Sequence, residues 1–538
     1  MQNKRRYPFN GCLHPVFLPL ALFLAYYLIR SGSAPWSDFA GYYFGGRELL
    51  SGRGANAYDM EKLNSLILHT GFRDVFVSYA PFPPFTSLVF APFLLLPMGT
   101  AKLVFDGVSC VFFLVTLMRA RVFLDIPPLL ILTLPVIFCF PMINNLFFGQ
   151  SYMLLCCLLL EGYMAYKKGH IVLSSLWWGV AIVFKVFPGV VLIWLLLQKK
   201  FRAAVALCVA CTLLLGASLL LNGWGIWKYY VLGILPKVNN GELNNSFTFL
   251  FQSAFMLLKR SFVYDALLNP SPLTNSPLVF GLLVSLFKAL ILSMCIGYTL
   301  RKKDRDFDSF AVWIAGSMLI SPNGSSYSLV LLVIPLFSLT TRSDSPRILS
   351  APLMTRILWS AVPMLLLAIA CFFPVYKLEN APVWEQFPRL YLLLLFFGLL
   401  VRPLRMAWHT GLWAGLALFF VIVFLAGYRR DPDASTYFFD REEHIFINDY
   451  SVSHGMLVYS YWDQSGAHPV STGLGVTKYE ELEVRNKQIY YKGKQLTTSP
   501  DAKIKPLLID GSFILYLSDK NRGPGFYTLR RLRLAEGS

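Results

Sequence analysis

Long apolar blocks separated by short polar segments make up the first 427 residues of the chain. The hydrocarbon core of a bilayer takes about 20 residues of helix to cross, and most of the blocks have roughly this length. The block 171–198 is longer, and we predict two short helices that bend near Lys185-Val186-Phe187-Pro188, because proline ends a helix. The pattern predicts a polytopic α-helical membrane protein. Its expected crossings, about thirteen with the block 171–198 counted twice, are 15–29, 99–118, 123–142, 150–166, 171–198, 203–222, 277–300, 308–320, 326–340, 354–374, 386–401 and 407–427.

Two segments between the first crossings have a different pattern. In the loop 30–81, the pieces 37–50 and 59–69 carry apolar residues on one side and polar residues on the other, as interfacial helices do. The stretch 81–97 that follows is short and broken by prolines. We expect it to dip into the membrane without crossing, and the sides assigned to later segments depend on this choice.

The C-terminal part, from about Tyr428 onward, is less hydrophobic and contains short alternating runs such as 513–517 and 526–529. The phrase 499–503, Ser-Pro-Asp-Ala-Lys, resembles a turn of a propeller blade, but a propeller needs at least about four four-stranded blades. The remaining residues are too few for that. We therefore predict two domains, a transmembrane domain over 1–427 and a small β-rich domain over 428–538.

Composition and charge agree with a membrane topology. Hydrophobic residues make up 56% of the chain and charged residues 14%, whereas soluble domains have about 25% charged residues. The net charge of +18 comes largely from basic clusters between apolar blocks, the distribution of cytoplasmic loops. This favours a membrane lipid partner and no nucleic acid. With the N-terminus inside, the first long loop and the C-terminal domain lie outside, as expected for a multi-pass protein of a bacterial inner (plasma) membrane. The clusters are Lys4-Arg5-Arg6, Lys167-Lys168, Lys199-Lys200-Arg202 and Arg301-Lys302-Lys303.

Two charged residues at the expected outer edge are candidates for chemistry, and each has a structural alternative. Lys185 lies in an otherwise apolar block just before Pro188. It could bind an anionic group such as a phosphate, or its side chain could simply reach the interface; its position does not decide between the two. Asp38 follows the first span. It could take a proton from an acceptor hydroxyl. From its position alone, an N-cap role for Ser37-Asp38 is the better explanation.

Several segments in order resemble the polyprenol-phosphate-dependent glycosyltransferases of family 87, GT-C-fold membrane enzymes that include mycobacterial mannosyltransferases. The resemblance covers roughly residues 13–340. It rests on the order and spacing of the segments rather than on any single motif. They are Asp38-Phe39 with Tyr42-Tyr43, Leu49-Leu50-Ser51-Gly52, Ala57-Tyr58-Asp59, Tyr79-Ala80-Pro81-Phe82-Pro83-Pro84-Phe85, Pro92, Leu96-Pro97, Phe148-Gly149-Gln150, Gly179-Val180-Ala181, Phe184-Lys185-Val186-Phe187-Pro188, Asn245-Ser246 and Ser321-Pro322.

The resemblance implies an inverting glycosyltransferase with Asp38 as general base. The donor would be a mannose-like hexose or a pentose on a polyprenyl phosphate, and the acceptor an extracytoplasmic glycan or lipid. Donor binding is then expected from Lys185, as partner of the phosphate, and from Gln150, Tyr42, Tyr79, Asn245 and Ser321.

This chain departs from the family at one place. Many members carry a Trp and a His shortly after Ser-Pro, and the sequence here is Ser321-Pro322-Asn323-Gly324-Ser325-Ser326-Tyr327-Ser328. That difference leaves the donor sugar and the acceptor open. We see no carboxylate cluster suited to a divalent ion, and we expect neither a metal nor another cofactor.

The main alternative is a transporter or flippase of lipid-linked or polar solutes. It would account for many spans and for a lysine within the membrane, but it explains the patterned first loop poorly. Transporters often contain two similar halves, and the sequence contains no convincing internal repeat. A membrane anchor for the β domain would need far fewer spans.

Overall fold

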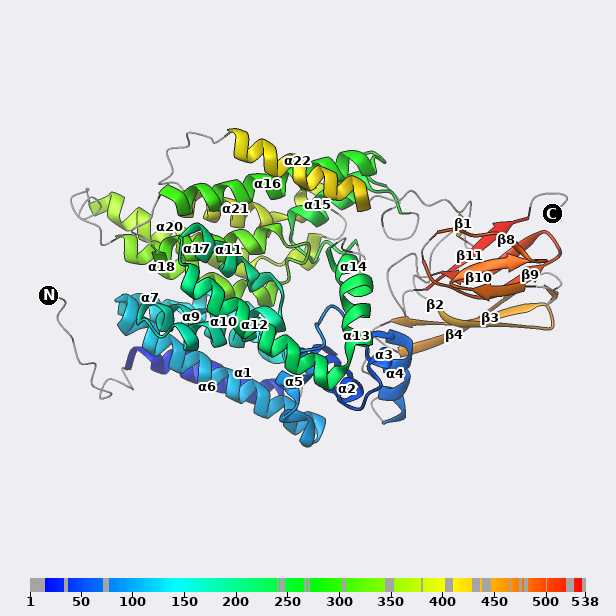
Figure 1. Cartoon of the computed structure of the whole chain (residues 1–538), viewed down its shortest axis with the longest axis horizontal. Coiled ribbons are helices and arrows are strands. Elements are labelled where there is room, and N and C mark those ends of the chain that lie inside the picture. Colours follow the sequence, from blue (N-terminus) through cyan, green and yellow to red (C-terminus); the bar gives the residue numbers. More distant parts are fainter. Residues whose placement is uncertain are drawn as a thin grey trace.

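The computed structural model of the chain is mostly helical up to residue 427 and consists of strands after it (Figure 1). Short helices α2–α5 gather at one end of the helical part, the end toward the C-terminal strands (Figure 1). The structure describes residues 15–32, 37–70, 77–239, 241, 247–265, 269, 271–301, 306–343, 353–378, 381–401, 410–427, 436–437, 447–463, 466–473, 477–478, 482–499, 501–518 and 527–534.

The helices follow the predicted apolar blocks, with short helices in the loops between them. Those of the first half are η2 (Pro15–Phe17), α1 (Leu18–Ser31), α2 (Ser37–Leu50), α3 (Gly54–Tyr58), α4 (Met60–His69), α5 (Thr86–Phe90), η3 (Phe93–Leu95), α6 (Met98–Leu124), α7 (Pro128–Ile137), α8 (Cys139–Phe148), α9 (Tyr152–Lys167), α10 (Ile171–Phe184), η4 (Phe187–Gly189), α11 (Val190–Leu197) and α12 (Phe201–Asn222). Those of the second half are α13 (Trp224–Tyr229), η5 (Tyr230–Ile234), α14 (Leu235–Asn239), α15 (Ala254–Phe262), α16 (Pro277–Arg301), α17 (Asp306–Ile320), η6 (Ser326–Leu332), α18 (Val333–Ser343), α20 (Leu353–Phe372), η7 (Val375–Leu378), η8 (Val383–Gln386), α21 (Pro388–Val401) and α22 (Thr410–Gly427).

Three helices among the described residues, α6, α12 and α16, are long and apolar enough to cross a membrane, and α7 with α8 makes a fourth if this bent pair is one span. The pair bends by 58°. Pro141 lacks the N–H that would continue the helix across this bend. Shorter apolar helices occupy many of the other predicted crossings, among them α10, α11, α21 and most of α22. The count of thirteen crossings stays a prediction.

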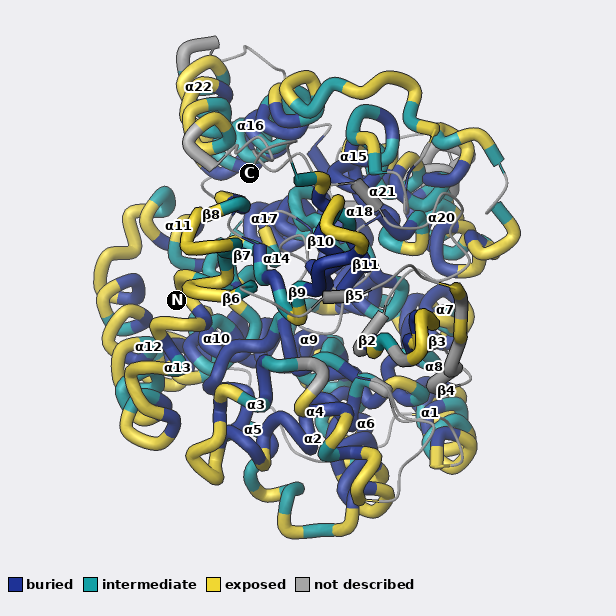
Figure 2. Tube along the Cα trace, turned by 90° about the vertical axis from the view of Figure 1, so that its right-hand side faces the viewer, coloured by how far each residue is buried: buried dark blue, intermediate teal, exposed yellow. Residues whose placement is uncertain are grey.

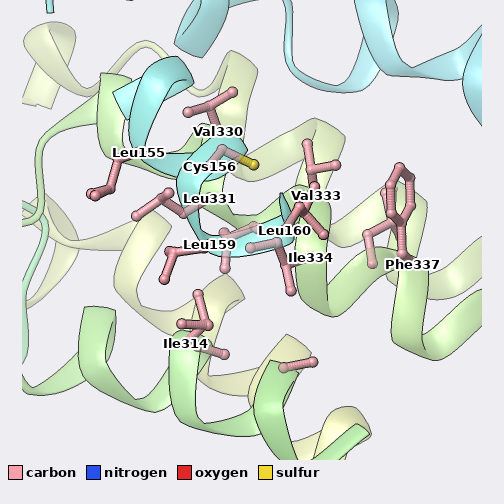
Figure 3. Packing of buried hydrophobic residues seen from close by; sticks show 14 of the residues in the cluster. Leu155, Cys156, Leu159, Leu160, Ile314, Val330, Leu331, Val333, Ile334 and Phe337 are labelled. Carbon is pink, nitrogen blue, oxygen red and sulfur yellow. The ribbon is translucent and has the colours of Figure 1, made fainter. Parts of the chain in front are cut away.

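Helix α9 is the centre of the main core. All of its residues from Leu155 to Ala165 are buried, as expected of a helix that is apolar on every side. It packs on α6 and α10 and on the segment η6–α18. Figure 3 shows Leu159 and Leu160 of α9 beside Ile314 of α17 and Val333 of α18. In Figure 2 the exposed residues lie instead on outer helices such as α12.

Two predicted segments that are not simple spanning helices, 81–97 and 171–198, are present in the structure. The stretch 81–97 contains only α5 and η3, five and three residues long, and neither can cross a hydrocarbon core of about 30 Å. The block 171–198 divides into α10 and α11, with Lys185 directly after the first helix and Pro188 in the turn. The backbone N–H of Lys185 makes a last helical bond to Ala181 O, 3.0 Å away.

Helix α2 differs from the prediction of an interfacial helix. Its residues from Phe39 to Gly46 are buried without interruption, so the helix has no solvent or lipid side over this stretch. The reason is that α3, α5 and η3 cover it. An interfacial helix would keep a polar face in contact with water or headgroups. The prediction of an interfacial α2 was therefore wrong, whereas its helical bounds and those of α4 were close.

The C-terminal region is a small antiparallel β structure, as predicted. One sheet has the order β1-β11-β10-β9-β5, and two three-stranded sheets are β2-β3-β4 and β6-β7-β8. Strands β9 and β10 bury Leu507, Leu508, Leu515 and Leu517 between the sheets. The domain boundary at 427/428 stays a prediction. The strands are β1 (Thr436–Tyr437), β2 (Ile447–Ser453), β3 (Met456–Asp463), β4 (Gly466–Gly473), β5 (Thr477–Lys478), β6 (Leu482–Arg485), β7 (Gln488–Tyr491), β8 (Lys494–Gln495), β9 (Lys503–Ile509), β10 (Phe513–Ser518) and β11 (Thr528–Arg533).

The close approach of α9 and α10 depends on Gly162. A Cβ at this position would lie 2.4 Å from Cδ1 of Trp178, whose indole N–H donates to Leu159 O at 3.2 Å. Gly162→Ala should lower the free energy of unfolding by about 1–3 kcal/mol, as overpacking does, measured by thermal unfolding of the purified protein. Gly216→Ala on α12 is the matched control, because nothing lies within 4 Å of a Cβ there. Equal stabilities for the two variants would contradict this account.

Candidate active site

The carboxylate of Asp38 lies in the first turn of α2 and reaches across to the segment after α8. Its Oδ2 accepts a hydrogen bond of 2.8 Å from Nε2 of Gln150. Asp38 is the second residue of α2, so it lies one residue past the start of the helix rather than before it. Two ring contacts hold the next residue, Phe39, against Phe90 of α5 and Phe105 of α6, with centroids 6.0 and 5.8 Å away. The start of α2 is thereby fixed in a buried position.

Gln150 is brought to Asp38 by a tight turn at the end of α8. Gly149 has a φ of 63°, a left-handed conformation that glycine adopts at helix C-termini without steric cost. Its N–H bonds to Leu146 O at 3.3 Å, and the N–H of Gln150 bonds to Asn145 O at 2.7 Å. A Cβ on Gly149 would lie 2.6 Å from Cβ of Phe39. The position therefore needs glycine both for its backbone conformation and for the close approach of α2.

Lys185 points from the break between α10 and α11 into a group of aromatic rings. Its Nζ lies 4.4 Å from the ring centroid of Tyr152 and 4.6 Å from that of Phe82. It also donates to the hydroxyl of Tyr42 at 3.3 Å. Aromatic faces attract a cation at such distances. This placement favours the interpretation of Lys185 as a site residue over that of a side chain reaching for the interface.

The polar side chains form one directed chain of hydrogen bonds. Lys185 donates to the Tyr42 hydroxyl, which donates to Oε1 of Gln150 at 3.1 Å. The amide N–H of Gln150 then donates to Asp38, and Ser151 Oγ lies 3.2 Å from the Tyr42 hydroxyl. Every donor in the chain faces toward the carboxylate. Charge-assisted hydrogen bonds of this kind favour the ionised form of a carboxyl group.

Asp38 itself titrates above its ordinary range. Burial raises the pKa of its carboxyl, while the hydrogen bond from Gln150 and the positive charge of Lys185 lower it and only partly offset the burial. The pKa of the Tyr42 hydroxyl is raised well above its ordinary value, chiefly by burial. Tyr42 therefore keeps its proton and serves as a donor to Gln150 and an acceptor from Lys185.

The other predicted site residues have different positions. Tyr79 is buried, with its ring against Gly45 of α2 and its hydroxyl donating to Pro83 O at 3.2 Å. Ser321 lies in the turn after α17, where its hydroxyl and the N–H of Asn323 are 3.3 Å apart. That turn packs on α15, since the Ser253 hydroxyl donates to Pro322 O at 2.6 Å. Asn245 lies outside the described residues. The structure thus brings together Asp38, Tyr42, Gln150 and Lys185.

Two tyrosines near these groups were not predicted from the sequence. The ring of Tyr327, at the start of η6, lies 5.4 Å from the ring of Tyr152, at the start of α9. The Tyr152 ring is also the one that lies 4.4 Å from Nζ of Lys185. In the sequence, an aromatic residue inside an apolar segment looks like an ordinary packing residue. Only the contact between two distant segments distinguishes these tyrosines from such residues. No three His, Cys, Asp or Glu side chains among the described residues form a group that could hold a metal ion.

A buried ion pair supports the turn that carries Gln150. Nζ of Lys102 on α6 lies 2.9 Å from Oδ2 of Asp106 and donates to Leu146 O at 2.6 Å. It also lies 3.4 Å from Ser31 O, at the end of α1. A lysine has three N–H donors, so all three are used. Leu146 O is one of the last carbonyls of α8, which need partners at a helix end. The lysine therefore ties α1, α6 and the end of α8 together.

Lys102→Met should destabilise the protein by about 3–5 kcal/mol, because it leaves the buried Asp106 carboxylate without its cation. The double variant Lys102→Met/Asp106→Leu removes both charges and should recover most of this loss. Thermal unfolding of the two purified proteins measures the difference. If Lys102→Met is as stable as the double variant, the Asp106 carboxylate does not depend on the Lys102 cation for its stability.

Comparison with known proteins adds an independent observation. The sequence profile of glycosyltransferase family 87 matches residues 80–322, a range that contains Gln150 and Lys185 and begins after Asp38 and Tyr42. Comparisons with curated proteins and with solved structures give no significant match. The matched range also contains α6, α12 and α16, the long apolar helices of this membrane protein. Residues 80–322 of the chain are therefore similar to glycosyltransferase family 87.

Proposed function

We propose that the protein is an inverting membrane glycosyltransferase. It moves a mannose-like hexose or a pentose from a polyprenyl-phosphate donor to an extracytoplasmic glycan or lipid acceptor. The observation that carries the proposal is the directed chain of hydrogen bonds from Lys185 to Asp38. It joins a cation suited to a phosphate with a carboxylate suited to a base. Gln150 and Lys185 lie within the range that matches the family, and Asp38 and Tyr42 precede it.

The reaction needs a base at one side of the sugar. At the other side it needs a positive charge that stabilises the departing phosphate. Asp38 takes the proton of the acceptor hydroxyl while that oxygen attacks the anomeric carbon. The bond between this carbon and the phosphate oxygen breaks, and the polyprenyl phosphate leaves with the electron pair. Attack opposite the leaving group inverts the anomeric carbon. Lys185 offsets the negative charge that grows on the departing phosphate.

The direction of helix α9 supports an outward-facing site. Tyr152 begins α9 beside Lys185, and Lys167 ends the same helix at the other side of the bundle. Lys167 and Lys168 belong to one of the basic clusters that mark cytoplasmic loops. The opposite end, with Asp38, then faces outward. An outward-facing site can use a lipid-linked sugar, which supplies its own activation and needs no nucleotide there.

Replacing Asp38 by Asn should abolish transfer while leaving the protein folded and inserted. Loss of a general base lowers turnover by about 10²–10⁴-fold, and the amide keeps the size of the carboxylate. Transfer from a polyprenyl-phosphate sugar is measured with purified protein. Asp59→Asn is the matched control, because Asp59 is also an aspartate at the start of a helix in this loop, where it caps α4 and pairs with Lys62 at 3.5 Å. Turnover retained by Asp38→Asn would remove Asp38 from the role of base.

The pH dependence of kcat/KM should show the raised pKa of Asp38. A base must be ionised, so the rate falls as the pH drops through its pKa, which we expect above the ordinary value of about 3.9. In Gln150→Leu this acid limb should move to higher pH, because the lost hydrogen bond favours the ionised form. Tyr43→Phe is the control, since the Tyr43 hydroxyl donates to Leu96 O. A shift to lower pH in Gln150→Leu, or none, would contradict this assignment.

A further inference from the structure

A row of aromatic side chains extends from Lys185 along the candidate site. Nζ of Lys185 lies 4.4 Å from the Tyr152 ring centroid. The Tyr152 and Tyr327 rings lie 5.4 Å apart with 35° between their planes, and Phe148 follows at 6.3 Å from Tyr327. Phe148 ends α8 and Tyr152 begins α9, which follows it directly in the chain, whereas Tyr327 comes from η6, far along the sequence. We call Tyr152, Tyr327 and Phe148 the aromatic row.

The row is held in place by one buried amide, that of Asn145, whose residue is only 1% exposed. Its Nδ2 donates to Tyr327 O at 2.9 Å, and its Oδ1 accepts from the N–H of Tyr152 at 3.1 Å. Its backbone carbonyl accepts from the N–H of Gln150. A single residue therefore fixes both tyrosines relative to the glutamine that contacts Asp38. A buried amide with such partners is costly to disturb.

The row is open enough to meet a ligand. Phe148 is 37% exposed, and Tyr152 and Tyr327 are half-buried. Tyr152 follows Gln150, the donor to Asp38, by two residues, so the row runs beside the candidate base. Tyrosine offers an apolar ring face and a polar tip. A pyranose ring has the complementary surface, with C–H bonds on its faces and hydroxyl groups around its edge.

We propose that Tyr152 and Tyr327 form the subsite for the sugar ring of the donor, with Asn145 as the positioning residue that aligns them. The inference rests on the proposed function and adds the part of the site that contacts the sugar rather than the phosphate. Lys185 lies at one end of the row and Asp38 beside it, so a sugar on the row has its phosphate near the cation. Its anomeric carbon is then within reach of an acceptor hydroxyl at the base.

Two lipid probes separate the sugar subsite from the phosphate site: polyprenyl phosphate and the same lipid carrying mannose. Binding of each is measured to the full-length protein in detergent. Tyr327→Leu and Tyr152→Leu should each weaken binding of the mannosyl lipid by roughly three- to tenfold, the range of one aromatic contact. Binding of the sugar-free lipid should stay unchanged. Tyr376→Leu alters an exposed tyrosine of η7 and should bind the two lipids like the unaltered protein. Tyr327→Phe keeps the ring and should weaken binding of the mannosyl lipid less than Tyr327→Leu does.

Asn145→Asp tests the positioning role, because it keeps the size of the side chain and loses the N–H donors to Tyr327 O. It should lower the preference for the mannosyl lipid over the sugar-free lipid and raise KM for the donor more than it lowers kcat. Asn144→Asp is its comparison, since the Asn144 amide donates to a hydroxyl, Ser326 Oγ at 2.6 Å, and not to the backbone of Tyr327. A smaller loss of preference is expected there.

The outcomes that overturn the inference are distinct from failure of the proposed function. Equal weakening of both lipids in Tyr327→Leu, or no change for either, would remove the sugar subsite and leave the donor assignment standing. Failure of the unaltered protein to bind either lipid would overturn the donor assignment and the subsite with it. A mannosyl-specific loss in both leucine variants that is smaller in Tyr327→Phe, with Tyr376→Leu unaffected, supports the subsite.

Discussion

The candidate site depends on keeping one carboxylate charged in an apolar environment. Burial disfavours the ionised form of Asp38, because a bare charge away from water would be costly. The chain Lys185–Tyr42–Gln150 reduces that cost, because each group donates toward the next and the last donates to the carboxylate. Burial still leaves the pKa of Asp38 raised. The balance suits a base, which must hold a proton weakly enough to release it and strongly enough to take it.

The chain of hydrogen bonds from Lys185 to Asp38 requires helices that end inside the bundle rather than cross it. Helix α8 ends at Gly149 and delivers Gln150, and α10 ends at Lys185 because Pro188 cannot continue it. Each end leaves backbone carbonyls that need partners. Lys102 supplies one at α8, from within a long membrane helix. The ion pair with Asp106 is therefore part of the support of the site.

The sequence predicted the elements better than the contacts between them. Apolar block length located the helices, and the proline after Lys185 predicted the break there. Asp38, Tyr42, Gln150 and Lys185 were expected at one site from the resemblance, and the structure brings these four together. Tyr79 instead packs in the interior, because the glycine at position 45 leaves room for its ring. The burial of α2 was missed because the helices that cover it are short and have no strong pattern.

Residues that act through long-range contacts could not be predicted. Nothing in the sequence around Tyr327 distinguishes it from a packing residue, and its neighbour Tyr152 is 175 positions away. Lys102 and Asp106 have the spacing of an ordinary helical ion pair, and only the tertiary structure shows that Leu146 O is their third partner. The thirteen crossings and the domain boundary depend on where the bilayer lies, which helix length and composition alone do not fix.

The central claim is that the protein consumes a lipid-linked sugar. Purified protein, incubated without nucleotide with a polyprenyl phosphate that carries a radiolabelled sugar, measures this directly. We predict that the label leaves the lipid and that free polyprenyl phosphate accumulates. Intact donor after incubation with each such lipid, together with solute flux through the protein in liposomes, would contradict the account and favour a transporter.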